Sequence, residues 1–145
     1  MIDSNFIKIS KPKIENVSHE TLDDLQKYAQ SILEKNNEIN LISSSTEKTI
    51  NTRHIEDSAQ IIEFIDINKD IICTDIGSGA GLPGIVIAIL TKSKNPEFKV
   101  ILYEKSYHKS TFLKNISKRL HLNTQVCQKN IFNQNNLLVD KHQNQ

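Results

Sequence analysis

The four glycines of this 145-residue chain all lie between Gly77 and Gly84, in the order Gly-Ser-Gly-Ala-Gly-Leu-Pro-Gly. Because glycine has no Cβ, it adopts positive φ without strain and lets the backbone approach a ligand closely. This glycine loop follows an apolar β-type run, 71–76, and precedes a second apolar run, 85–90. A strand, a glycine-rich loop and a helix in this order form a nucleotide-type binding site in α/β proteins. We therefore expect the function of the chain to centre on this loop.

Several ligands compete for such a loop. A phosphate-binding P-loop is excluded, because it needs a lysine directly after its last glycine. A dinucleotide such as NAD remains open, since a GxGxxG pattern ends at Gly84 and Glu104 follows at the distance of a ribose-binding acid. S-adenosylmethionine is the third candidate, because its methyltransferases carry an acid ending the first strand, then GxGxG, then an acid ending the second strand. Asp75, residues 77–81 and Glu104 fill those places. A glycine-rich turn without a ligand is the fourth.

S-adenosylmethionine fits these side chains chemically. Glu104 can accept hydrogen bonds from both ribose hydroxyls at the crevice where open α/β sheets bind ligands. Loop N–H groups can meet the methionine carboxylate, and Asp75 can brace the loop beside the positively charged sulfonium. We expect Gly77, Gly79 and Leu82 to face the main pocket and Glu104 to form its opposite rim, with no metal site. An exposed strand-end carboxylate is the structural alternative for Glu104.

The elements that position these residues follow from apolar periodicity. In the N-terminal part, 18–70, apolar residues recur at helical spacing after a cap at Ser18 or Thr21, and a second helical stripe follows through Ser58, Ile61, Ile62 and Ile65. From residue 71 onward strands and helices alternate, at 71–76, 84–93, 98–103, 107–120 and 124–128.

Alternation of this kind predicts a parallel sheet with right-handed crossovers. The fold class is therefore α/β, with N-terminal helices followed by a partial Rossmann-like methyltransferase sheet. With three strands, the first is expected to have one unpaired edge. We expect a single domain, in which residues 1–17 form a loose leader, 71–132 the ligand-binding α/β part and 133–145 a polar tail.

Charge is distributed unevenly along the chain. Residues 15–70 contain twelve acidic and five basic residues, whereas residues 92–119 contain eight basic and two acidic ones. A basic segment beside a ligand loop suits a polyanion such as nucleic acid, although a solvated helix face is the alternative. The candidate phosphate contacts are Lys105, Lys109, Lys114, Lys118 and Arg119.

The two cysteines and the lack of long apolar runs bear on location. Cys73 and Cys127 lie in apolar runs without CxxC spacing, which predicts reduced thiols and a cytoplasmic protein. No apolar run approaches the ~20 residues of a membrane span. We expect no membrane partner and a monomer.

Three sequence blocks together resemble the ribosomal RNA small-subunit methyltransferase G family, also called glucose-inhibited division protein B. They are LEKNNEINL at 33–41, RHIEDS at 53–58 and DIGSGAGLPG at 75–84. The resemblance runs from about residue 20 to about residue 132. It implies a cytoplasmic enzyme that transfers a methyl group from S-adenosylmethionine to N7 of a guanine in small-subunit (16S) rRNA, with the small ribosomal subunit as partner.

Carried over by position, the resemblance implies that Gly77 and Leu82 line the cofactor pocket and that Asn130 and Ile131 touch its adenine end. Ile131 stands where the family has an acid, and Asn130 where it has a small residue. An isoleucine can pack against adenine but cannot accept a hydrogen bond from its amino group. Asn36 stands where the family usually has tryptophan.

Methylation of guanine N7 needs no general base, because the attacking lone pair carries no proton, so positioning supplies most of the acceleration. A hydrolytic interpretation of His54, Asp57 and Ser58 is disfavoured, since adjacent helical positions rarely give the geometry of a catalytic triad. We expect these three side chains to form a structural cluster or a pocket wall.

The resemblance stops before the end of the family pattern. The family continues into further strands, with a Ser-Arg-Ala segment whose arginine belongs to the active site, and nothing after Phe132 matches it. We therefore expect a truncated version with weak or absent rRNA methylation, low solubility and low thermal stability. A non-catalytic cofactor-binding remnant is the alternative function, and an NAD-binding protein is a further one.

Overall fold

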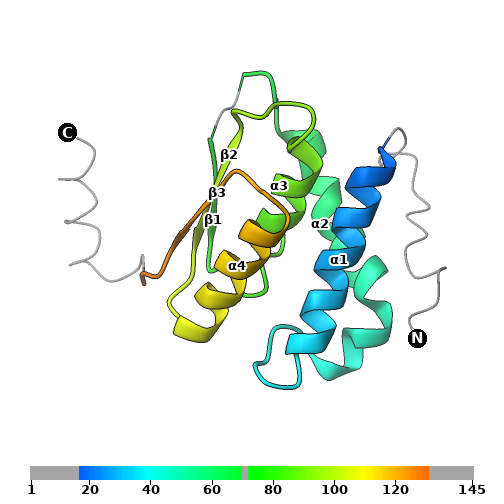
Figure 1. Ribbon diagram of the computed structural model, residues 1–145, viewed down its shortest axis with the longest axis vertical. Coiled ribbons are helices and arrows are strands. Elements are labelled where there is room, and N and C mark those ends of the chain that lie inside the picture. The colour runs from blue at the N-terminus through cyan, green and yellow to red at the C-terminus, as the bar shows by residue number, and fades with distance from the viewer. Residues whose placement is uncertain (1–16, 70–71, 131–145) are drawn as a thin grey trace.

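The computed structural model describes residues 17–69 and 72–130 (Figure 1). Residues 1–16 of the expected 1–17 leader, the expected tail over 133–145 and Ile131 therefore lie outside the described residues. Helices and strands follow one another as α1 (His19–Lys35), η2 (Ser44–Thr49), η3 (Asn51–Glu56), α2 (Asp57–Ala59), η4 (Gln60–Phe64), β1 (Ile72–Ile76), α3 (Gly84–Thr91), β2 (Lys99–Tyr103), α4 (Tyr107–Arg119) and β3 (Thr124–Cys127). Within the described ranges, no helix has both the length and the apolar character that crossing a bilayer requires.

Helix α1 begins at the first of the two predicted caps. The Ser18 hydroxyl accepts a hydrogen bond from the Thr21 N–H at 3.1 Å, which satisfies one of the N–H groups that have no partner within the helix. The buried face contains Leu25, Ala29 and Ile32, as the apolar spacing predicts, together with Tyr28. Burial of this face fixes the orientation of the helix against the rest of the molecule.

Residues 44–64, called here the irregular helical region, change helix type along their length. A 3₁₀ segment is followed by a π-helical segment, a short α-helical segment and a second 3₁₀ segment. Each change of type alters the number of residues per turn, so side chains no longer stay on one face. The predicted stripe is therefore not formed as a continuous face, since Ser58 is buried but Ile61 is exposed.

The predicted parallel sheet is confirmed, with the strands in the order β1-β2-β3. Asp75 of β1 is opposite Leu102 of β2, which is opposite Val126 of β3. Figure 1 shows the helices gathered on one side of the sheet, where Val100 and Leu102 are buried. Because all three strands run in the same direction, their carboxyl ends meet at one edge.

The opposite face of the sheet is less covered. Side chains alternate between the two faces of a strand, and Ile72 and Ile76 of β1 are 56% and 50% exposed. Among the described strands, only β2 pairs with β1, so its other edge has no described partner. The expected unpaired edge of the first strand therefore holds for the described part of the chain.

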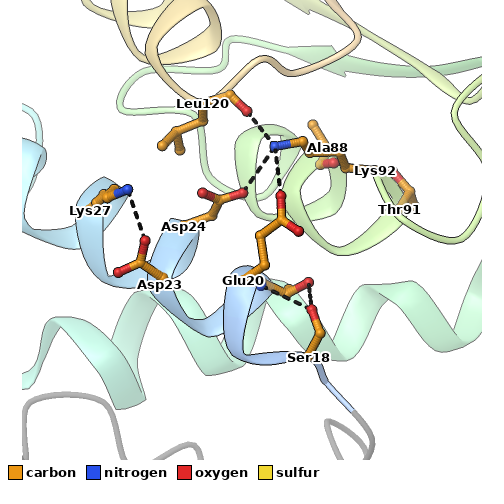
Figure 2. A network of polar contacts seen from close by, with 10 residues as sticks. Ser18, Glu20, Asp23, Asp24, Lys27, Ala88, Thr91, Lys92 and Leu120 are labelled. Carbon is orange, nitrogen blue, oxygen red and sulfur yellow. Dashed lines mark hydrogen bonds and ion pairs between the residues drawn. The ribbon is translucent and has the colours of Figure 1, made fainter.

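A polar network joins α1 to the sheet unit (Figure 2). The ammonium group of Lys92, at the end of α3, donates to the Leu120 carbonyl at 2.8 Å and to Asp24 Oδ2 at 3.3 Å. Glu20 Oε1 lies 3.9 Å from the same nitrogen. Asp24 is buried, so loss of Lys92 leaves a carboxylate without its cation, at a cost of about 1–3 kcal/mol. This network fixes α1 relative to α3 and α4.

Candidate functional site

A cavity of about 360 Å³ opens at the carboxyl ends of the strands. Gly77 and Gly79 of the glycine loop and Glu104 after β2 all line it, and Asn130 lies on its wall after β3. The full described lining is Ile76, Gly77, Gly79, Tyr103, Glu104, Lys105, Lys109, Lys129 and Asn130. The sheet therefore brings together four of the residues named from the sequence, although they span more than fifty positions of the chain.

Leu82 differs from the other predicted site residues. It is absent from the described lining of the cavity, and its partly buried side chain packs against the hydrophobic core instead. The loop is buried on both sides of Gly79, at Ser78 and at Ala80 and Gly81, and Leu82 follows this buried stretch. A contact between Leu82 and a cofactor stays a prediction.

The N–H groups of the glycine loop donate to β2 and to the loop itself. The N–H groups of Gly77 and Ser78 both donate to the Tyr103 carbonyl, at 2.9 and 3.0 Å, and the Gly81 N–H donates to the Ser78 carbonyl at 2.7 Å. These donors are used within the protein, whereas the sequence suggested that loop N–H groups meet a ligand. The loop therefore contributes space rather than these three donors.

Space is provided by Gly79 in particular. Its φ is +55°, and a Cβ built on it meets nothing within 4 Å. A side chain at this position would project into open space while its backbone was held in a conformation that L-residues rarely adopt. The same is true of Gly77, with φ +72°. The floor of the cavity is thus bare backbone, which suits a flat or sugar-like ligand.

Glu104 spans the crevice from β2 to the glycine loop. Its Oε2 accepts a hydrogen bond from the Gly79 N–H at 2.8 Å, and its Oε1 accepts one from the Ser106 N–H at 3.0 Å. A carboxylate oxygen has two lone pairs, so each oxygen keeps one acceptor position. Glu104 is therefore fixed in orientation and still able to accept hydrogen bonds from paired hydroxyl groups.

Asp75 braces the start of α3, as expected from its place in the sequence. Its Oδ2 accepts a hydrogen bond from the Gly84 N–H at 3.0 Å, and a Cβ on Gly84 would lie 2.7 Å from the same oxygen. Glycine is therefore required for this close approach. Burial raises the pKa of the Asp75 carboxyl above its usual value, against the hydrogen bonds from Gly84 and Ser78, which lower it.

Tyr28 is a support of the site that the sequence analysis missed. Its hydroxyl donates to the Ala80 carbonyl at 2.7 Å, across a separation of 52 positions. Burial, together with the Asp75 charge, raises the pKa of Tyr28 well above its usual value, so the hydroxyl stays protonated and donates. A tyrosine in a buried stripe signals a polar partner, but the sequence does not say which one.

Comparison with known proteins identifies the family. A family model described as rRNA small subunit methyltransferase G matches residues 21–141. This chain belongs to that family. The match extends past about residue 132, where the resemblance was expected to end. It includes the glycine loop, Glu104 and Asn130, so the whole described lining of the cavity lies within the part that methyltransferase G proteins share.

Three relatives carry the name Ribosomal RNA small subunit methyltransferase G. A Pelagibacter ubique protein is 53% identical over 83% of this chain and 57% of its own length. A Cereibacter sphaeroides protein is 43% identical over 77% of this chain and 53% of its own length. An Orientia tsutsugamushi protein is 42% identical over 71% of this chain and 49% of its own length. The chain thus spans about half the length of these relatives.

The second motif shared with methyltransferase G proteins, 53–58, does not form a catalytic triad. The Nε2 atom of His54 is hydrogen-bonded to Thr46 Oγ1 at 2.9 Å, whereas Asp57 is exposed and Ser58 is buried. Burial lowers the pKa of His54, and the Asp57 charge opposes this effect. Among the described contacts, His54 is hydrogen-bonded to Thr46 rather than to Asp57 or Ser58, so a hydrogen-bonded cluster of these three side chains stays a prediction.

The basic residues of α4 and of the segment just before it separate into two groups in this methyltransferase G chain. Lys105 and Lys109 line the cavity, whereas Lys114 and Lys118 are exposed further along the helix. The Arg119 guanidinium donates to the Ser31 hydroxyl of α1 at 2.9 Å. The candidate phosphate contacts therefore do not form one uniform face, and two of them lie at the cavity.

Proposed function

We propose that this chain binds S-adenosylmethionine in the cavity at the carboxyl ends of its strands and acts in methylation of a guanine N7 in small-subunit rRNA. The observation that carries the proposal is the meeting of bare glycine backbone and the fixed Glu104 carboxylate across one cavity. A nucleoside needs both features, namely space for its rings and an acceptor for its ribose hydroxyls. Membership of the methyltransferase G family supports the choice of cofactor and of substrate.

The proposal gives each lining residue a specific task. Glu104 holds the ribose hydroxyls, Gly77 and Gly79 leave room for the cofactor, and Asn130, with Ile131 outside the described residues, meets the adenine end. Leu82 remains a predicted contact. Bound S-adenosylmethionine supplies a methyl group activated by a positively charged sulfur. Since guanine N7 carries no proton, no general base is needed, and the task of this chain is to hold and orient the cofactor and the guanine.

Binding is tested by calorimetry with S-adenosylmethionine and, separately, with NAD. Gly79→Val fills the cavity and Glu104→Gln removes the negative charge that faces the ribose, so we expect the first to abolish binding and the second to weaken it about tenfold. Glu97→Gln is the matched control, because Glu97 is an exposed carboxylate before β2. Unchanged affinity in Gly79→Val, or preference for NAD, would overturn the choice of site or of cofactor.

Catalytic competence is a separate measurement. Transfer of labelled methyl groups to unmethylated small subunits is compared with that of a full-length methyltransferase G protein. We expect weaker transfer by these 145 residues alone than by the full-length control, because they match only about half of the length of their relatives. Cofactor binding without transfer would favour the alternative, a non-catalytic cofactor-binding protein. Transfer equal to the full-length control would contradict the expectation. A cytoplasmic location and a monomeric state remain predictions tied to this substrate.

A further inference from the structure

An exposed aromatic ring lies in the segment that carries two of the lysines of the cavity lining. Tyr107, the first residue of α4, is 64% exposed although it is one of the largest apolar side chains in the chain. Its ring meets His108 edge-on, with centroids 5.5 Å apart and planes at 76°. This arrangement leaves most of the tyrosine ring in solvent. A large aromatic side chain that is neither buried nor hydrogen-bonded into the core is available to stack on a ligand.

Lysines flank this ring and extend into the cavity. Lys105 precedes Tyr107 by two positions and Lys109 follows it by two, and both line the cavity together with Lys129. Glu104 is the acidic residue of the described lining, and both its oxygens accept hydrogen bonds from the backbone. The rim, defined here as Lys105, Tyr107, His108 and Lys109, therefore combines two lysines of the cavity lining with an exposed ring within one five-residue segment.

The proposed cofactor does not account for this charge. S-adenosylmethionine has a single carboxylate against an ammonium and a sulfonium group, so its net charge is positive. Several ammonium groups around its pocket oppose its binding unless a polyanion is bound there as well. Alternating basic and aromatic side chains are typical of surfaces that bind single-stranded nucleic acid, in which phosphates meet cations and unpaired bases stack on rings.

We propose that this rim binds single-stranded RNA next to the cofactor cavity, with Tyr107 stacking on an unpaired base and Lys105 and Lys109 binding the adjoining phosphates. The inference rests on the proposed function, which makes rRNA the substrate. It selects single-stranded RNA because the bases of an A-form duplex are stacked on each other and have no free face for the ring. The proposal also assigns phosphate binding to Lys105 and Lys109 rather than to Lys118, because Lys118 lies about 13 Å further along the helix axis than Lys109.

The test measures binding of a fluorescent single-stranded RNA oligonucleotide by anisotropy, using the whole 145-residue chain over a series of salt concentrations. Tyr107→Ala is expected to weaken binding about 5- to 100-fold, and Tyr107→Phe to retain it, because phenylalanine also stacks. Lys105→Gln with Lys109→Gln is expected to reduce the slope of log affinity against log salt by about 1.4. Lys114→Gln with Lys118→Gln is the matched control and is expected to change neither quantity appreciably.

Three outcomes would overturn the rim proposal. They are equal affinity of Tyr107→Ala and the parent, an equal effect of the control lysine pair, and tighter binding of a matched RNA duplex than of the single strand. Circular dichroism of each variant separates loss of binding from loss of folding, and Tyr107→Phe provides a folded comparison.

Calorimetry with S-adenosylmethionine on the same samples separates this proposal from the proposed function. A parent chain that binds the cofactor but not the RNA probe contradicts the rim alone. One that binds the RNA through Tyr107 but not the cofactor contradicts the proposed function and leaves the rim intact. Displacement of the RNA by NAD, with NAD affinity lost in the Lys105 and Lys109 variant, would assign the rim to a dinucleotide instead.

Discussion

The glycine loop and the irregular helical region differ in how they accommodate buried polar groups. Around the glycine loop, the polar side chains of Tyr28, Asp75 and Glu104 each have a hydrogen-bond partner in the backbone. In the irregular helical region, Asn51 Oδ1 and Glu56 Oε1 are buried without one. Buried polar atoms without partners cost free energy, and satisfied ones hold a structure in one arrangement. The comparison indicates that the buried polar side chains named here have hydrogen-bond partners at the site, whereas two buried oxygens of the irregular helical region do not.

The largest effect is expected where the site is packed most tightly. A side chain at Gly84 meets Leu102 and the Asp75 carboxylate, so Gly84→Val should lower the free energy of unfolding by about 3 kcal/mol in urea titrations followed by circular dichroism. Gly79→Ala is the control, since its Cβ meets open space and only the positive φ opposes it, at about 1–2 kcal/mol. A smaller loss of stability in Gly84→Val than in Gly79→Ala would contradict the claim that the chain is tightly packed around Gly84.

Two glutamates test the comparison directly. Glu104→Leu leaves the Gly79 and Ser106 N–H groups without an acceptor and should destabilise the chain by about 2 kcal/mol. Glu56→Leu removes a buried oxygen that has no partner and should leave stability unchanged or raise it by about 1 kcal/mol. Urea titration of both variants measures the difference. Equal losses would mean that the two regions do not differ in this respect.

A smaller effect is expected from the contact between α1 and the loop. Tyr28→Phe removes the donor to the Ala80 carbonyl and should cost about 1–2 kcal/mol of stability. If Tyr28 positions the loop, affinity for S-adenosylmethionine should also fall a few-fold. Tyr107→Phe is the matched control, because the Tyr107 side chain is exposed. Full affinity and full stability in Tyr28→Phe would show that the loop holds its shape without this bond.

The smallest effect concerns pH. The folded chain lowers the pKa of His54 below its usual value, so the unfolded chain binds the proton more readily. Stability associated with neutral His54 is therefore present above about pH 6.5 and falls as pH decreases from there through the folded pKa. In His54→Gln, the midpoint of unfolding should change less with pH between pH 5 and 7 than it does in the parent. A midpoint that rises as pH falls across this window would contradict the sign of the shift.

The sequence predicts the sheet better than the supports of the site. Alternating apolar runs are local signals, and they locate the three parallel strands and the Ser18 cap. By contrast, Tyr28 is hydrogen-bonded to Ala80, 52 positions away, and Lys92 to Asp24, 68 positions away. Only tertiary packing decides which residues form such distant pairs. Leu82 illustrates the same limit, because the direction of one side chain in a tight turn depends on the packing around it.

The irregular helical region failed to follow its apolar pattern for a related reason. Helical periodicity assumes one helix type throughout, whereas residues 44–64 change type three times. The exposed side chains of Ile61 and Phe64 follow from this change rather than from a lack of apolar residues. Sequence patterns therefore predict a regular element well and an irregular one poorly.

Titration of the ¹⁵N-labelled chain with S-adenosylmethionine, followed by NMR, tests the central claim most directly. We predict saturable shifts of the amide signals of Gly77, Gly79, Glu104 and Asn130, and small shifts for the polar cavity around Asn40, Ser43 and Glu47, which serves as an internal control. NAD at the same concentrations should shift the first group less. Shifts confined to the second group, or no saturable shifts at all, would contradict the assignment of the cofactor site.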